Sequence, residues 1–510
     1  MVRAIAARIQ GDDYQARWFW IQACRLFTPL TKVVKVAYEF HGVKSFDDVV
    51  VYYEGRMDDE GNSLLAEYYQ VKFHVTSAGA FTWQGMMDPG FINASSISIL
   101  QRLKNAQQQF APYGMEAHFI LYSPWQIHPD DPLAQIHSVA DGRLDWERLA
   151  RRGGDRSKMG KIRTAWREHL KLDSDEELRI VLRPLRILPG KTLIELNEKL
   201  NDKLYQAGLK PVEEGQLIHP YDDLARRLIQ SGKTEFIRSD IEAICKRENL
   251  WMEPPISRPN AYQVGIRSFL RWAENLEDET DVMLDLLRWF DGRNIKSPEL
   301  WQEQIYPAVQ NFLATLSPNQ TCHLHLHAHL SIAFAAGYCL NSKSGIDVAV
   351  VQSTRSGRII WHPTANPNQD AYPTWIFTEE LLAEGGSDIA IAIEITHDIP
   401  TDVKLYLAQT QLPIRRIISA RLPGRPNPQA ILDGDHAKLL ADQLSNYLRV
   451  NRTLTERQSQ LHIFAAAPNG LVFFIGQVAR SFGTTAFYEY DFDTNMPGAY
   501  QPSLAFPPLS

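Results

Sequence analysis

Three polar side chains stand beside or within strongly apolar stretches near the N-terminus. Asp48 directly precedes the run VVVYY, and Gln70 and Lys72 lie two positions apart in the run LLAEYYQVKFHV. Residues two apart on a β-strand share a face, so pairing of the two runs would bring Asp48 to the patch of Gln70 and Lys72. A carboxylate and an amide oxygen are suitable ligands for Mg²⁺, and a nearby ammonium can hold an attacking water and offset charge on a phosphate. The pattern predicts a site for metal-dependent phosphodiester hydrolysis.

An α/β unit is expected around these residues. Periodicity predicts a helix, three strands, a second helix and a further strand over residues 12–27, 32–40, 47–53, 64–75, 94–110 and 116–123. Gln15 falls on the first helix and Glu39 on the strand before Asp48, so both are candidate supporting groups. Asp47 is a third, and it is a rival to Asp48 as metal ligand. The alternative is that Lys72 is an ordinary edge or snorkelling residue.

A helical extension is expected from about residue 141 to 290, where KTLIELNEKLNDKLYQAG and DVMLDLLRWFDG have amphipathic patterns. Residues 148–171 contain nine Lys and Arg against two acidic residues, which would suit DNA phosphates, although a solvated helix face is the alternative. The candidate DNA contacts in this segment are Arg151, Arg152, Arg156, Lys158, Lys161 and Arg163.

The remaining residues, about 291–510, alternate strand-like and helix-like runs, which predicts a mostly parallel sheet flanked by helices in two related halves, 291–397 and 398–510. Ligands of such sheets bind at the carboxyl ends of the strands, where helix N-termini offer N–H groups to a phosphate. Candidate ligand contacts at these positions are His327, His329, Ser331, Gln352, Thr396, His397, Pro468, Asn469, Gly470 and the nearby cation Arg480.

Four histidines alternate with apolar residues in CHLHLHAHL and therefore face one side of a strand. A zinc site is the less favoured interpretation, because ligands along one straight strand do not converge on a tetrahedral centre. His323 and His325 are expected in the core, whereas His327 and His329 fall at the strand end.

The whole-chain composition argues against a membrane-spanning or disulfide-rich protein. The 510 residues are 44% hydrophobic with a net charge of −7, and no stretch approaches 18 uncharged apolar residues. The four cysteines have no CxxC spacing and are interpreted as free thiols. We therefore expect a soluble, cytoplasmic protein with no membrane partner.

The arrangement of Asp48, Gln70 and Lys72 resembles the D…QxK variant of the restriction-endonuclease-like PD-(D/E)xK superfamily, over about residues 10–130. The C-terminal stretches HLHLHAHLSIAFAAGYCL, IAIEITHDI, AAAPNGLVFFIGQ and YEYD resemble a SAVED domain, a sensor of cyclic oligonucleotides built of two CARF-like halves. Together the two parts resemble a SAVED-type DNA endonuclease effector of the anti-phage CBASS pathway.

This resemblance implies a multidomain α/β fold, with a restriction-endonuclease-like core at 1–140, its helical extension at 141–290 and a SAVED domain at 291–510. It implies Asp48, Gln70 and Lys72 as catalytic residues, with Mg²⁺ or Mn²⁺ held by Asp48 and Gln70. The implied activity is cleavage of double-stranded DNA, switched on when a cyclic di- or trinucleotide binds and the chain self-associates, with a trinucleotide favoured. Three alternatives remain: a ligand-sensing adaptor, an RNA-targeting nuclease, and a restriction-type nuclease that needs no ligand.

Overall fold

The computed structural model describes residues 2–42, 46–58, 60–72, 80–92, 95–139, 141–150, 156–213, 219–252, 261–270, 273–318, 320–354, 357–364, 372–492 and 496–508. The chain divides into two compact units. The first comprises Met1–Arg258 with Glu277–Glu279, and the second comprises Pro259–Leu276 with Thr280–Ser510. Each unit is described by itself.

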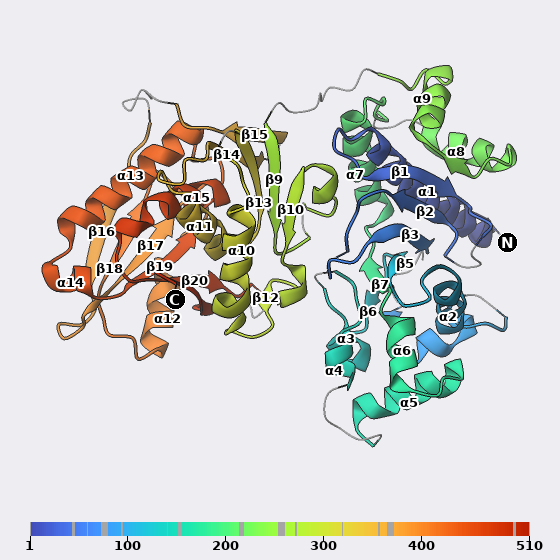
Figure 1. Cartoon of the computed structure of the whole chain (residues 1–510), viewed down its shortest axis with the longest axis horizontal. Coiled ribbons are helices and arrows are strands. Elements are labelled where there is room, and N and C mark those ends of the chain that lie inside the picture. The colour runs from blue at the N-terminus through green and yellow to red at the C-terminus, as the bar shows by residue number, and fades with distance from the viewer. Residues whose placement is uncertain are drawn as a thin grey trace. The chain divides into compact units, whose positions relative to one another are not determined.

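The first unit is built on a six-stranded mixed sheet of order β7-β5-β3-β2-β1-β8 (Figure 1). Its strands are β1 (Val33–Tyr38), β2 (Val49–Tyr53), β3 (Leu64–Val71), β5 (Glu116–Ser123), β7 (Leu185–Pro189) and β8 (Glu235–Phe236). The pairs β1–β2, β2–β3 and β1–β8 are antiparallel, whereas β5 is parallel to both β3 and β7. The strands expected around Asp48 and Gln70 are confirmed.

Helices cover both faces of this sheet, and alternate residues of β2 reach both cores. Val49 and Val51 pack in the core with α1, whereas Val50 packs in the opposite core with α2. Burial on both faces explains why the run VVVYY is apolar throughout. The helices are α1 (Val2–Cys24), α2 (Ile99–Phe110), α3 (Pro132–Ile136), α4 (Trp146–Ala150), α5 (Lys158–Leu170), α6 (Asp175–Leu182), α7 (Leu193–Gln206), α8 (Pro220–Gln230) and α9 (Arg238–Arg247).

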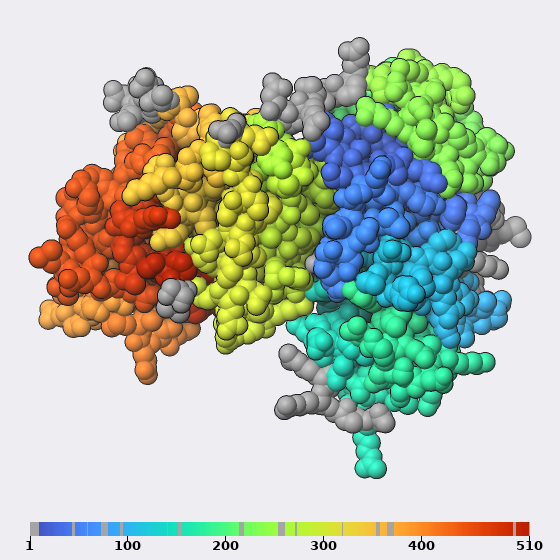
Figure 2. Space-filling model, viewed as in Figure 1, coloured from blue at the N-terminus to red at the C-terminus, as the bar shows by residue number. Residues whose placement is uncertain are grey.

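Side-chain caps fix where several of these helices begin. Ser98 and Thr192 each accept the backbone N–H three residues later and form complete capping boxes at α2 and α7. α1 packs against α7 and α8, and in Figure 2 the light green surface that contains α8 and α9 adjoins the blue surface of the N-terminal segment. A small pair of strands, β4 (Ala80–Phe81) and β6 (Gln126–Ile127), lies outside the main sheet.

The second unit contains two larger sheets. The five-stranded sheet has the order β10-β9-β13-β14-β15, and the six-stranded sheet has the order β16-β18-β17-β19-β20-β21. Pairing is parallel except at β15, β16 and β21, which confirms the expected mostly parallel arrangement. The strands are β9 (Tyr262–Arg267), β10 (Val282–Asp285), β13 (Cys322–His327), β14 (Val348–Thr354), β15 (Gly357–Trp361), β16 (Ile376–Leu381), β17 (Asp388–Glu394), β18 (Ile414–Arg421), β19 (Leu461–Ala466), β20 (Thr485–Tyr490) and β21 (Tyr500–Phe506).

Two helices join the halves of the second unit through glycine. A Cβ on Gly337 would lie 2.0 Å from the carbonyl oxygen of Phe473, and a Cβ on Gly476 would lie 2.2 Å from that of Phe334. α11 and α15 therefore cross backbone to backbone, an approach that any larger residue would prevent. The helices of this unit are α10 (Tyr306–Leu313), α11 (Leu330–Cys339), α12 (Pro400–Gln409), α13 (Gly434–Asn451), α14 (Leu454–Gln458) and α15 (Asn469–Val478), and a short hairpin pairs β11 (Phe290–Asp291) with β12 (Asn294–Ile295).

Two expectations about the organisation of the chain were wrong. The run DVMLDLLRWFDG is not a helix, because Val282–Asp285 form β10 and Leu287–Trp289 form a short 3-10 turn. β9 and β10 thus place part of the presumed helical extension in the second unit. The boundary between the two halves also does not lie at 397/398, because β16 at Ile376–Leu381 already belongs to the second sheet.

Candidate functional site

The register of β2 and β3 brings Asp48 to Gln70. Val49 pairs with Tyr69, so Asp48, one residue earlier, lies opposite Gln70 at the end of the antiparallel ladder. The Oδ2 of Asp48 accepts the Val71 N–H at 2.6 Å and also accepts a hydrogen bond from the Nε2 of Gln70. Asp48 is 9% exposed and Gln70 is 4% exposed. The predicted meeting of the carboxylate and the amide is therefore present.

Lys72 directly follows β3 at the same end. Its backbone N–H donates to the carbonyl of Tyr122 on β5 at 2.9 Å, which continues the parallel pairing beyond Val71. The side chain is half-buried, and its positive charge acts on both Asp48 and Glu39 to lower the pKa of each. Lys72 therefore lies within electrostatic reach of the buried carboxylate.

The Asp48 carboxyl group is hard to ionise in this setting. Burial raises its pKa from 3.8 to about 7, and the charges of Glu39 and Asp47 add to the rise. Lys72 and the Val71 N–H oppose it. Burying a carboxyl group whose charged form is this costly is unfavourable, and groups with strongly shifted pKa values concentrate at functional sites.

The supporting residues named from the sequence lie beside this carboxylate. Glu39 follows β1, and its backbone N–H donates to the carbonyl of Asp48 at 3.0 Å. The Nε2 of Gln15, on α1, donates to the Glu39 carboxylate. Burial raises the pKa of Glu39, and Asp47 adds to that rise. Asp47 is half-buried, and its carbonyl accepts the Phe40 N–H at 2.7 Å.

The donor set suits a divalent cation that keeps much of its water. Among the described residues, no three His, Cys, Asp or Glu side chains converge as metal ligands do. Mg²⁺ is commonly held by only one or two carboxylates together with waters and substrate phosphates, so a site built on Asp48 fits it. Because the Gln70 amide donates its Nε2 to Asp48, its oxygen is the atom left to meet a cation.

The basic segment is only partly available to DNA. Lys158 and Lys161, on α5, are exposed, as is Arg156, so these three could reach phosphates. Arg163 could not, because it is 7% exposed and bound to Asp175 and to the carbonyl of Leu149. Arg151 and Arg152 lie outside the described residues.

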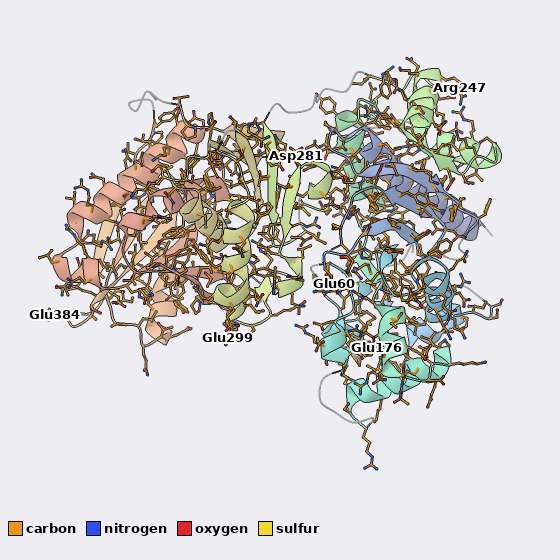
Figure 3. All side chains as sticks on the ribbon, in the orientation of Figure 1. Glu60, Glu176, Arg247, Asp281, Glu299 and Glu384 are labelled. Carbon is orange, nitrogen blue, oxygen red and sulfur yellow. The ribbon has the colours of Figure 1, made fainter. Side chains whose placement is uncertain are left out.

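Elsewhere in this unit, Glu60 (labelled in Figure 3) forms an ion pair with Arg183.

In the second unit, His325 and His327 of β13 are buried, whereas His323 is only half-buried and so does not lie fully in the core as expected. His325 donates its Nε2 to the Gln263 side chain at 2.9 Å, in agreement with a core role. His329 also turns inward, since its Nε2 contacts the carbonyl of Arg293 at 2.8 Å and its Nδ1 contacts the Ser268 hydroxyl at 2.6 Å. Burial lowers the pKa of His327 and of His329 to about 4, so both are neutral near pH 7. His329 is therefore a poor candidate for ligand contact.

The N-terminus of α11 is capped by a residue that sequence reasoning missed. The Glu489 carboxylate, on β20, accepts the Ser331 N–H at 2.7 Å and the Ser331 hydroxyl at 2.6 Å. This carboxylate occupies the position where a phosphate was expected to meet Ser331. The signal for it was the alternating pattern of TAFYEYD, which places Glu489 on the face opposite Tyr488 and Tyr490.

The N-terminus of α15 joins the strand ends of the two sheets. The Nδ2 of Asn469 donates to the carbonyls of Leu326 and Ala328 at 2.9 and 3.0 Å, at the carboxyl end of β13. The Gly470 N–H donates to Gln352 at 3.4 Å, at the carboxyl end of β14. Thr396 reaches the same region, because its N–H donates to the carbonyl of Ala466 at the end of β19. These contacts bring Gln352, Thr396, Asn469 and Gly470 together as predicted from their positions at strand ends.

Two other ligand candidates do not join this group. Arg480 follows the opposite end of α15, roughly 15 Å along the helix from Asn469, and its guanidinium lies over the Tyr338 ring. His397 is exposed and hydrogen-bonds to the neighbouring Thr396 hydroxyl at 3.0 Å. Pro468 is the N-cap residue of α15 and stands beside Asn469.

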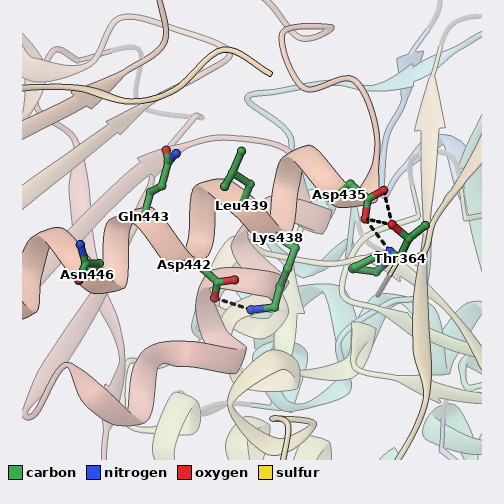
Figure 4. Close-up of a pocket in the computed structure, with 8 residues that line it drawn as sticks. Thr364, Asp435, Lys438, Leu439, Asp442, Gln443 and Asn446 are labelled. Carbon is green, nitrogen blue, oxygen red and sulfur yellow. Dashed lines mark hydrogen bonds and ion pairs between the residues drawn. The ribbon is translucent and has the colours of Figure 1, made fainter. Parts of the chain in front are cut away.

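A shallow pocket of about 290 Å³ lies elsewhere on the second unit, along the exposed side of α13 (Figure 4). Thr364 binds Asp435 there through its N–H and hydroxyl, and Lys438 pairs with Asp442. None of the candidate ligand contacts lines it.

No helix in the described part of the chain is long and apolar enough to span a membrane.

Comparison with known proteins gives the family. The profile of the SAVED family, the SMODS-associated and fused to various effectors sensor domain, matches residues 305–506. CD-NTase-associated protein 4 of Enterobacter hormaechei subsp. hoffmannii (strain UCI 50) is 37% identical over 512 residues, which cover 99% of this chain and 100% of that protein.

Solved structures resemble the chain more distantly. The Acinetobacter baumannii Cap4 SAVED/CARF-domain containing receptor with the cyclic trinucleotide 3′3′3′-cAAA is 15% identical with a TM-score of 0.37, and the match covers 96% of this chain and 98% of that one. The Moraxella osloensis Cap4 SAVED/CARF-domain containing receptor is 16% identical with a TM-score of 0.34, over 98% and 99% of the two chains.

The mixed α/β units and the SAVED match define the chain as a SAVED-domain effector of CBASS, as the sequence resemblance implied. More narrowly, identity over the full length shows that the chain belongs to the CD-NTase-associated protein 4 family.

Proposed function

We propose that the chain is a metal-dependent endonuclease that cuts double-stranded DNA when a cyclic oligonucleotide binds its SAVED domain. One observation carries the nuclease assignment. At the end of the paired strands β2 and β3, the buried Asp48 carboxylate accepts a hydrogen bond from the Gln70 amide and lies within electrostatic range of Lys72. A carboxylate that is costly to bury and to ionise is well suited to hold a cation.

Each of the three residues has a separate role in this proposal. Asp48 and the Gln70 amide oxygen would hold Mg²⁺ or Mn²⁺, which when bound polarises a phosphate and makes a coordinated water more acidic. Lys72 would orient the attacking water and offset the negative charge that develops on the phosphate. The exposed Lys158 and Lys161 would add sequence-independent contacts to the DNA backbone.

The regulatory part of the proposal concerns the second unit. Gln352, Thr396, Asn469 and Gly470 would contact the cyclic oligonucleotide where the strand ends of the two sheets meet. Ligand binding would favour self-association, because one site cuts one strand and a double-strand break needs two sites or two visits. The ligand can shift the chain toward the assembled form only by binding that form more tightly.

The test uses purified wild-type protein and Lys72→Ala with plasmid DNA, Mg²⁺ and a panel of cyclic di- and trinucleotides, and sizes both proteins with each ligand. Lys246→Ala is the matched control, because Lys246 is an exposed lysine on α9 whose contacts, with Glu242 and the Trp251 ring, do not involve the candidate site. We expect one ligand to switch on DNA cleavage by wild type and by Lys246→Ala, while Lys72→Ala stays inactive. The same ligand should shift all three proteins to a larger species in the size measurement.

Other outcomes would favour the alternatives. Cutting without any ligand would overturn regulation and support a restriction-type nuclease. If the ligand binds and the protein assembles but DNA is not cleaved, an RNA substrate is tested next. Cleavage of the RNA would indicate an RNA-targeting nuclease, and no cleavage would indicate an adaptor.

A further inference from the structure

Glu39 has an unusual backbone for its residue type. Its φ is 50°, in the left-handed region, where glycine and asparagine are favoured and an ordinary L-residue is strained. The strained residue directly follows β1 and stands within the candidate catalytic site. Strain of this kind persists only where the surroundings impose it, and it concentrates at functional sites.

The pairing of β1 with β2 sets Glu39 opposite Asp48. Tyr38 pairs with Val49, and the ladder continues one step further because the Glu39 N–H donates to the Asp48 carbonyl at 3.0 Å. Like charges directly opposite each other on paired strands are destabilising. The chain thus holds two acidic residues together where a neutral pair would be more stable.

The side chain of Glu39 is also held in place. Gln15 reaches from α1 and donates its Nε2 to the Glu39 carboxylate, so a helix on one face of the sheet fixes the orientation of that group. Lys72 is the cation whose charge acts on Glu39 and on Asp48. One ammonium does not neutralise two carboxylates, and Gln70 contributes no charge.

We infer that Glu39 is the second carboxylate of the divalent-cation site, facing the same cation as Asp48 from the β1 side. This inference rests on the proposed function. It assigns the backbone strain and the unfavourable pairing of like charges to one cause, since a divalent cation would turn two repelling carboxylates into two ligands. It also gives Gln15 a role, because an outer hydrogen bond orients a ligating carboxylate.

Titration calorimetry of the full chain with Mn²⁺ alone tests the inference without any measurement of activity. Glu39→Gln keeps an oxygen that can accept from Gln15 but loses the charge. Glu39→Asp keeps the charge and tolerates the left-handed backbone better than most residues. Asp202→Asn removes an exposed carboxylate of α7 as the matched control.

We expect Glu39→Gln to weaken Mn²⁺ binding at least ~10-fold, Glu39→Asp to weaken it less, and Asp202→Asn to leave it unchanged. Asp48→Asn separates the two levels of the claim. If Asp48→Asn abolishes binding while Glu39→Gln binds as wild type does, the inference about Glu39 is wrong and the proposed metal site stands. If the wild type binds no Mn²⁺, both are wrong.

Discussion

Replacing Asp48 with Asn should stabilise the metal-free protein at high pH. Burial raises the pKa of Asp48 from 3.8 to about 7, so the folded protein disfavours the charged form. Each unit of pKa difference is worth ~1.4 kcal/mol, which puts the destabilisation above pH 7 at about 4 kcal/mol. This penalty starts as the pH rises past 3.8 and is complete above about 7, because in that interval the folded state binds more protons than the unfolded state.

The Asn variant keeps an oxygen that can accept the Val71 N–H but carries no charge. Weaker hydrogen bonds cost it ~1–2 kcal/mol. Asp48→Asn should therefore be about as stable as wild type at pH 5 and about 2–3 kcal/mol more stable at pH 8, which corresponds to roughly 5–10 °C in Tm.

Calorimetric unfolding of both proteins in EDTA from pH 5 to pH 8 measures this difference, with Asp202→Asn, which removes an exposed carboxylate of α7, as the control. Mg²⁺ identifies the relevant transition, because a ligand at 100 times its Kd adds about 3 kcal/mol to wild type and nothing to a variant that cannot bind it. The reasoning would be refuted if Asp48→Asn were less stable than wild type at every pH. It would also be refuted if the difference in the free energy of unfolding between the two proteins were the same at every pH.

Four further changes have defined outcomes. Gly337→Ala should lower the free energy of unfolding of the second unit by about 3 kcal/mol, measured by thermal unfolding, because the new Cβ would lie 2.0 Å from a carbonyl oxygen of α15. Arg163→Ala should destabilise the first unit by ~2–4 kcal/mol without changing the salt dependence of DNA binding, since its partners are internal. The double change Lys158→Ala with Lys161→Ala should leave the stability of the first unit unchanged. It should lower the slope of log affinity for DNA against log salt by roughly 1–2, measured by fluorescence anisotropy. Asn469→Ala should cost the second unit ~1–3 kcal/mol and weaken binding of a cyclic trinucleotide in calorimetry, because two strand-end carbonyls lose their donor.

Much of the first unit could be predicted because its signals are local. The run VVVYY is apolar at every position, and a strand buried on both faces has that pattern. Pairing of β2 with β3 then followed from their adjacency, and it brought Asp48 to Gln70.

The failures have physical reasons as well. A short apolar run such as DVMLDLL fits a buried strand or a helix equally well, and only pairing with β9 decided for β10. The basic segment did not reveal that Arg163 is buried against Asp175, because charge counts contain no information on burial. His329 and Ser331 were placed correctly at a strand end, but their partners come from Ser268, Arg293 and Glu489, which are distant in sequence. The left-handed backbone of Glu39 leaves no trace in its residue type.

We predict that ligand binding in the second unit controls cleavage at Asp48, Gln70 and Lys72. The most direct measurement is the initial rate of plasmid cleavage by the wild-type chain in Mg²⁺ as a cyclic trinucleotide is titrated, with the mass of the protein followed by light scattering in the same samples. We predict no cutting without the ligand, and cutting that rises together with the formation of a larger species. Full cleavage by a monomer, or a rate independent of every cyclic nucleotide tested, would contradict the claim.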